Sequence, residues 1–170
     1  MAELDLDVDR WRMQRRGGPP PVIGEAVLRN YPLRLFQLQR EHMAAVVQEF
    51  DRVQNQHDAG QFTPPQHVFD VAEMFRTVFG AMIQAVYEER QRAFEAGCDR
   101  MDSRVPLIKK TPDYLDHFRL VFDAVDEFSR QGLLKTPPRP LLVAALLDWT
   151  MSELTAQYFG ADPTPWAGPF

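Results

Sequence analysis

Apolar residues recur every three or four positions along four segments of this chain. The clearest is PLRLFQLQREHMAAVVQEFDRVQNQH (32–57), where the apolar residues lie on one side of an α-helix. The same period predicts helices over 66–96, from Thr111 to Gly132, and over 137–159. Four amphipathic helices joined by short links favour an all-α fold, and we expect an antiparallel four-helix bundle.

Three segments lack this period. Residues 1–31 contain Gly-Gly followed by three prolines, which is typical of a flexible N-terminal arm. Residues 161–170 form a C-terminal tail with three prolines and a tryptophan, and cannot be helical. Between the second and third helices, 105–108 is expected to be a brief extended strand or a buried loop. The chain therefore divides into an arm (1–31), a helical bundle domain (32–160) and a tail.

Size and charge narrow the functional classes to which this protein can belong. The 170 residues suit one domain, and 45% hydrophobic residues are ordinary for a globular protein. A net charge of −5 argues against a main role in nucleic-acid binding, and the basic cluster RWRMQRR (10–16) is interpreted as a solvated arm. No apolar run is long enough for a membrane span, and the N-terminus lacks the order of a signal peptide. We expect a cytoplasmic protein without membrane contact.

Catalytic and metal-binding motifs are missing. Di-metal sites in helical bundles use Glu-x-x-His pairs, and no histidine of this chain has a glutamate three positions before it. His57 is the best of the poor candidates for a haem ligand, although a helix-end or surface role is the commoner one. Cys98, the only cysteine, has no recognisable catalytic setting. We therefore expect no metal, no cofactor and no enzymatic activity, while an enzyme with an unrecognised site stays open.

A string of ionisable residues crosses the first helix. Helical geometry places Arg40, His42 and Glu49 on the flanks of the apolar face, and Glu41 outward. Flank residues commonly bury their stems and keep their charged heads in water. The alternative is that these four residues, together with Trp149 of the fourth helix, form a binding surface for a partner protein.

Glu153 is the one ionisable residue that the helical period places inside the apolar face. Thr150 and Gln157 align with it, so the last turns of the fourth helix carry an inward polar seam. A buried carboxylate needs a partner, and we expect a buried ion pair with Arg40, or else a ligand pocket. Trp166 of the tail is expected to be a strap laid across the bundle rather than an exposed docking peptide.

Several of these motifs together resemble a known pattern. The segment PLRLF-QLQ-REHMAAVVQEF (32–50), the stretch VDEFSRQGLL (125–134), the spacing of Trp149 and Glu153, and PTPW (163–166) carry the likeness. The pattern is similar to that of short all-helical actinobacterial regulatory proteins, which are neighbours of partner-switching modules built from an anti-sigma kinase and a STAS-domain antagonist.

The resemblance covers 32–58 and 112–167 and implies an accessory regulator without catalysis. Our first hypothesis is a non-enzymatic cytoplasmic regulatory protein that acts by protein–protein interaction in a stress or sigma-factor circuit, with an anti-sigma or STAS-type partner. The alternative is a small-molecule-sensing helical bundle whose ligand lies between the first and fourth helices.

Overall fold

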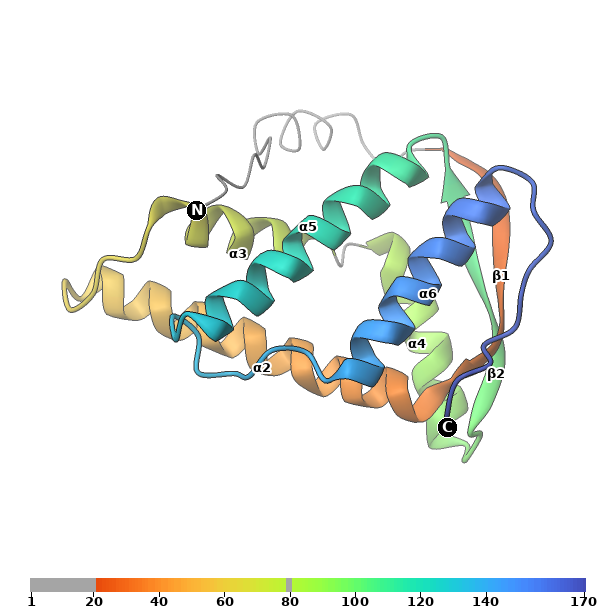
Figure 1. Ribbon diagram of the computed structural model, residues 1–170, viewed down its shortest axis with the longest axis horizontal. Helices are drawn as coiled ribbons and strands as arrows, with labels where there is room; N and C mark the ends of the chain where they lie inside the picture. The colour runs from red at the N-terminus through yellow and green to blue at the C-terminus, as the bar shows by residue number, and fades with distance from the viewer. Residues whose placement is uncertain (1–20, 79–80) are drawn as a thin grey trace.

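The computed structural model describes residues 21–78 and 81–170, and within them the chain forms five helices and a two-stranded sheet (Figure 1). The elements in chain order are β1 (Val22–Pro32), α2 (Leu33–Asp58), α3 (Gln66–Val78), α4 (Ala81–Glu95), β2 (Arg100–Ile108), α5 (Thr111–Arg130) and α6 (Leu141–Tyr158). The predicted all-α four-helix bundle is therefore wrong, because the fold combines helices with an antiparallel sheet. No helix of the described segments is long and apolar enough to cross a membrane.

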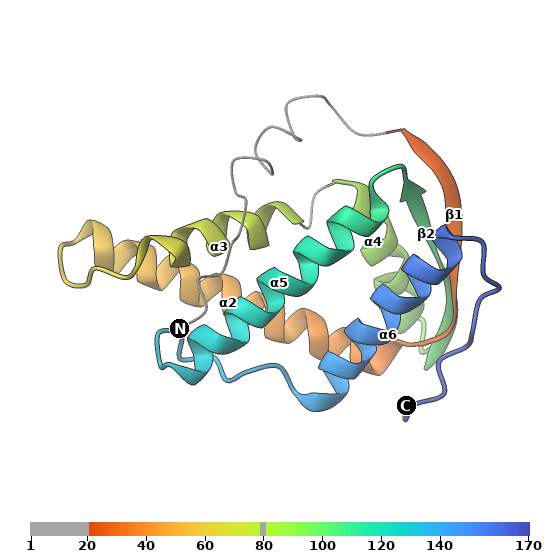
Figure 2. The ribbon, with the colours of Figure 1, turned by 45° about the horizontal axis from the view of Figure 1, so that its top comes forward.

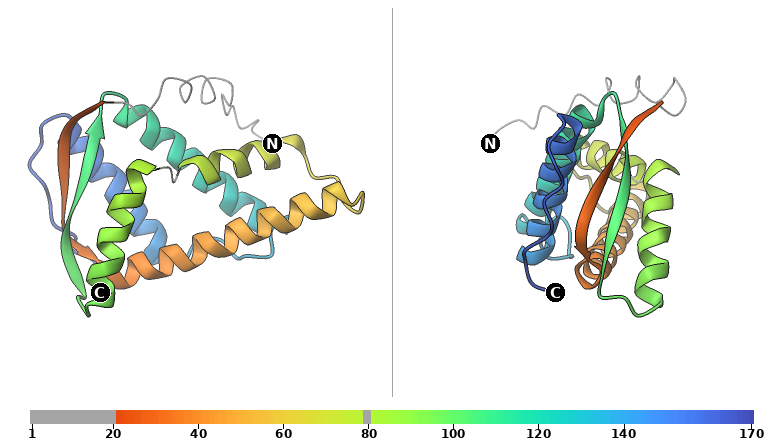
Figure 3. Two further views of the ribbon diagram at one scale, coloured as in Figure 1. Left: turned by 180° about the vertical axis from the view of Figure 1, so that it is seen from behind. Right: turned by 90° about the vertical axis from the view of Figure 1, so that its right-hand side faces the viewer.

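The helical period located three of the four predicted helices well. α2, α5 and α6 begin and end within about four residues of the expected limits, in line with the usual uncertainty of helix ends. The second predicted helix is instead two helices, α3 and α4, which run in different directions (Figure 3). The sequence between them contains Gly80, and glycine is the weakest helix former after proline.

β1 and β2 pair antiparallel, with Ala26 opposite Val105 and Leu28 opposite Ser103. β1 occupies the second half of the predicted flexible arm, so Val22–Pro32 belongs to the fold, and the remaining 1–20 lie outside the described residues. A bulge follows Leu28, where Asn30 adopts a positive φ of 59°. Asparagine tolerates this conformation better than most residues, and the Asn30 backbone N–H donates to Asp102 Oδ1 at 2.8 Å.

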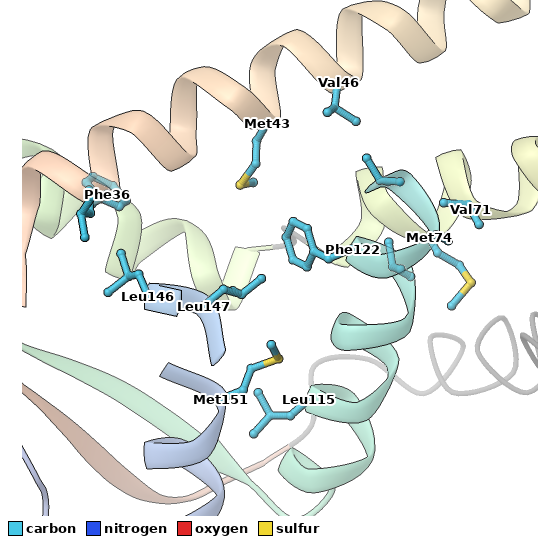
Figure 4. Packing of buried hydrophobic residues seen from close by; sticks show 14 of the residues in the cluster. Phe36, Met43, Val46, Val71, Met74, Leu115, Phe122, Leu146, Leu147 and Met151 are labelled. Carbon is cyan, nitrogen blue, oxygen red and sulfur yellow. The ribbon is translucent and has the colours of Figure 1, made fainter. Parts of the chain in front are cut away.

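The sheet stands between two helices at one end of the molecule, with α6 along β1 and α4 along β2 (Figures 2 and 3). α2 is the longest helix, and α3, α4 and α6 all pack against it. Buried side chains of α2, α5 and α6 meet between these helices (Figure 4).

The last turn of α6 and the C-terminal tail together cover the outer edge of β1. The side-chain amide of Gln157 bonds both the N–H and the carbonyl of Val27, at 2.8 and 3.0 Å. Trp166 continues this pairing, since its N–H donates to the Arg29 carbonyl at 3.0 Å. Its indole is buried and meets Trp149 edge to face, with ring centroids 5.4 Å apart. The predicted strap is thus confirmed, and it closes an otherwise open strand edge.

Candidate functional site

A partly open cavity of about 100 Å³ is lined by residues of β1, β2, α2, α4, α5 and α6. Most of its wall is apolar. Figure 4 shows side chains of α5 and α6 converging on the space between these helices. The apolar wall includes Val86, Leu115, Phe118, Phe122, Leu147 and Met151.

Arg90 is the only charged side chain among the described residues that line this cavity, and it is only 5% exposed. Its Nε donates to Ser103 Oγ at 2.9 Å, and its Nη1 donates to the Tyr31 hydroxyl at 3.1 Å. The guanidinium also lies over the Tyr31 ring, 3.9 Å from the centroid. Contacts to β1 and β2 thus hold this α4 side chain at the cavity wall, an arrangement that the sheet makes possible.

Four further polar side chains line the cavity. Gln39 of α2 is buried, with 6% of its surface exposed. Thr150 of α6 neighbours Tyr31, but its Oγ1 is buried without a hydrogen bond of ordinary geometry. Burial raises the pKa of Tyr31 and of Tyr87, and the charge of Arg90 only partly opposes this. Both phenols therefore remain neutral at physiological pH, and the cavity presents several polar groups on an apolar wall, as small-molecule sites do.

Two wider hollows lie on the surface, and their linings differ from that of the cavity. One of about 520 Å³ contains exposed Cys98 beside Asp99 and Arg34, whose side chains are 72% and 64% exposed. The other, of about 350 Å³, runs along one side of α4 near Arg40. Neither hollow is lined by a buried polar atom that lacks a hydrogen bond in the described chain, whereas the cavity is lined by Thr150, so we place the candidate site in the cavity.

The residues predicted from the first helix do not form one free surface. Arg40 donates to Gln91 of α4 and to Gln37, and its guanidinium is 5.9 Å from the Phe36 ring centroid. Glu41 is exposed and accepts from Gln37 at 3.1 Å. None of the predicted site residues lines the cavity.

The side chains of Glu49, His42 and Trp149 are partly covered by other parts of the fold. Glu49 accepts from Arg52 at 2.8 Å and from the Lys135 backbone N–H at 2.9 Å, so it fixes the link between α5 and α6. Burial alone would raise the pKa of Glu49, but these hydrogen bonds hold it below its ordinary value. Trp149 packs between Tyr31 and Trp166. Of the proposed docking residues, Glu41 alone keeps an exposed side chain.

Glu153 is buried, as the helical period predicted, but its expected pairing with Arg40 is wrong. Its Oε2 accepts from the Thr164 backbone N–H at 2.9 Å and from Gln157 Nε2 at 3.2 Å. No arginine of the described segments lies within ion-pair distance of it. The tail takes the place of the expected partner, so the carboxylate anchors the strap.

His42 supplies a pH test of the fold. Burial lowers the pKa of His42 below its ordinary value of 6.5, although the charge of Asp126 opposes this and that of Arg139 adds to it. The unfolded chain then binds more protons than the folded chain near and below pH 6.5, so stability falls as the pH drops through this range.

We expect denaturant midpoints to decrease from pH 7.5 to 5.5, and to decrease less in the His42→Gln variant. The interval stays above the titration range of Glu49, whose pKa is lowered. His67→Gln, at an exposed position, is the matched control and should keep the full pH dependence. An unchanged slope in His42→Gln contradicts this assignment.

Comparison with known proteins found no matching family model, no similar curated protein and no similar solved structure. The described residues contain no group of three or more His, Cys, Asp or Glu side chains placed to hold a metal ion. The site is therefore interpreted from its own geometry.

Proposed function

We propose that this protein is a small-molecule sensor that binds its ligand in the core cavity. The observation that carries the proposal is a mostly apolar cavity lined by the buried side chains of Gln39 of α2 and Arg90 of α4 and by Thr150 of α6, whose Oγ1 is buried without a hydrogen bond of ordinary geometry. Buried polar groups are unfavourable unless they are hydrogen-bonded, and a bound molecule or ordered water would satisfy them. The location agrees with a ligand between the first and last long helices, the second of the two functional hypotheses from the sequence.

A partner protein of anti-sigma or STAS type stays a prediction. In the docking surface inferred for it, Glu49, Trp149 and Arg40 all contact other parts of the fold. The cavity is therefore the better supported site, and a regulatory partner would bind a surface other than the one first predicted.

The proposal is tested by filling the cavity. In Val86→Phe the larger ring enters the cavity, so we expect the free energy of unfolding to stay within about 1 kcal/mol of the parent value. Val46→Phe is the matched control, because Val46 is buried in α2 away from the cavity, and overpacking there should cost about 1–3 kcal/mol. Chemical denaturation measures both. Equal destabilisation of the two variants contradicts an open cavity at Val86.

Ligand binding is tested on the parent protein and on Val86→Phe. A ligand at 100 times its Kd stabilises the folded state by about 2.7 kcal/mol, which a thermal-shift screen of small apolar acids, amides and alcohols detects. We expect compounds that raise the Tm of the parent protein and leave that of Val86→Phe unchanged. If every compound shifts both proteins equally, the molecules do not bind in the cavity and the proposal fails.

A further inference from the structure

Arg90 has unused hydrogen-bonding capacity at the cavity wall. A guanidinium carries five N–H donors, and the described residues accept from only two of them, through Ser103 Oγ and the Tyr31 hydroxyl. The Nη2 group forms no hydrogen bond with any described residue. The remaining donors belong to a side chain that is 5% exposed and borders the cavity.

The charge of Arg90 is also unmatched. No carboxylate of the described segments lies within ion-pair distance of it, and its contacts are two hydroxyls and the faces of Tyr31 and Phe36. Arg139, the other strongly buried arginine side chain, provides the contrast. It bonds Asp126 at 2.8 Å and Asp123 at 2.9 Å. A buried cation without an anion is unfavourable, so the environment of Arg90 lacks a negative group.

Resting on the proposed function, we propose that the ligand is a small monocarboxylate whose carboxylate binds Arg90. A planar carboxylate accepts two parallel hydrogen bonds from a guanidinium. One arginine, the only charged described residue of a mostly apolar wall, matches a single negative charge on an apolar body better than a phosphate group, which offers more charge and more acceptors. Gln39 and Thr150 lie on the same wall as further hydrogen-bonding groups.

The size of the cavity limits the apolar body. Its volume is about 100 Å³, and an apolar cavity of about 150 Å³ accommodates benzene. The cavity is thus smaller than one that holds the six carbons of benzene, so a straight-chain acid of about two to four carbons is the size class that fits, with its methylenes against Phe122, Leu147 and Met151.

The test compares acids with their neutral amides of the same shape. Dissociation constants of acetate, propanoate, butanoate, pentanoate, hexanoate and octanoate, and of butanamide, are measured on the full chain by ligand-observed NMR at constant ionic strength. Affinity should rise about fourfold per added methylene while the cavity fills, and then stop rising. Butanoate should bind at least about tenfold more tightly than butanamide, because only the acid neutralises Arg90.

Two variants test whether the preference for the acid over the amide depends on Arg90. In Arg90→Met, butanoate and butanamide should bind within about threefold of each other, since the hydrogen-bonded charge pair is gone. Arg92→Met removes an exposed arginine of the same helix and should keep the full preference for the acid. The comparison of acid with amide on the unmodified chain needs no variant, so it decides the matter even if Arg90→Met does not fold.

The outcomes separate the two proposals. If acid and amide bind the unmodified protein equally well, and only Val86→Phe abolishes binding, the carboxylate inference is wrong and the cavity function stands. If neither an acid nor an amide of any length binds, the proposed function fails as well. If octanoate and longer acids continue to gain affinity, binding is not confined to a cavity of this size and the inference is overturned.

Discussion

Replacing Arg139 with methionine should lower the free energy of unfolding by about 3–5 kcal/mol, because the change leaves the Asp126 carboxylate buried without its cation. Arg139 Nε and backbone N–H both donate to Asp126 at 2.8 Å, and the two side chains are 8% and 9% exposed. The guanidinium also lies 5.1 Å from the centroid of Phe122, which lines the cavity. The pair therefore fixes the start of α6 against the helix that forms the cavity wall.

Arg130→Met is the matched control for this prediction. Arg130 pairs with Glu127 on the same helix, α5, but both side chains are about half exposed, so its removal should leave the denaturation midpoint unchanged. Urea denaturation of both variants measures the contrast. Equal destabilisation by the two substitutions would contradict the prediction that the buried pair of Arg139 and Asp126 stabilises the fold more than the exposed pair of Arg130 and Glu127.

The second large effect concerns the tail. Trp166→Ala should lower the free energy of unfolding by about 3–5 kcal/mol, as is usual when a buried tryptophan is truncated. Its indole fills the space against Trp149, and its Nε1 donates to the Pro169 carbonyl at 3.2 Å. Because the indole also holds the tail against β1, we expect faster exchange in this variant of the backbone N–H of residue 166, which donates to the Arg29 carbonyl, and of Thr164, which donates to Glu153.

Phe159→Ala supplies the control for the tail. Phe159 is an aromatic residue at the end of α6, 74% exposed, and its removal should change stability by no more than about 0.5 kcal/mol. Hydrogen exchange followed by mass spectrometry reads both variants. Unchanged exchange at residues 164 and 166 in Trp166→Ala would show that the indole does not hold the tail against the strand edge.

The sequence was sufficient for helices whose apolar face is long and regular, and insufficient for the sheet. β2 does alternate, with Met101, Ser103 and Val105 on one side and Asp102 and Arg104 on the other. Only 105–108 was interpreted as a brief strand or a buried loop, because no second strand was recognised with which it could pair. That second strand, β1, follows directly on a run of prolines and glycines that is typical of an unstructured arm.

The site was missed for a related reason. Arg90 lies in the stretch EERQR, which is typical of a solvated helix face, and only its position four residues after Val86 hinted that it lies on the inner side. Its burial follows from the sheet, because Ser103 and Tyr31 accept its hydrogen bonds. Without the sheet, no pattern in the helix identifies this arginine.

Glu153 shows what helical periodicity predicts and what it cannot predict. The 3.6-residue repeat placed this carboxylate inward correctly, since it depends only on neighbours along one helix. Its partner depends on the path of the tail, where the Thr164 N–H donates to it. A proline-rich segment has no period from which such a path can be read, and the guess of Arg40 was wrong.

The most direct test of the account is a crystal structure of the full chain at saturating butanoate. We expect electron density for the acid in the core cavity, with its carboxylate within hydrogen-bonding distance of Arg90 and its chain against Phe122 and Met151. A structure in which neighbouring side chains fill this space, or in which the acid lies elsewhere, would contradict the account.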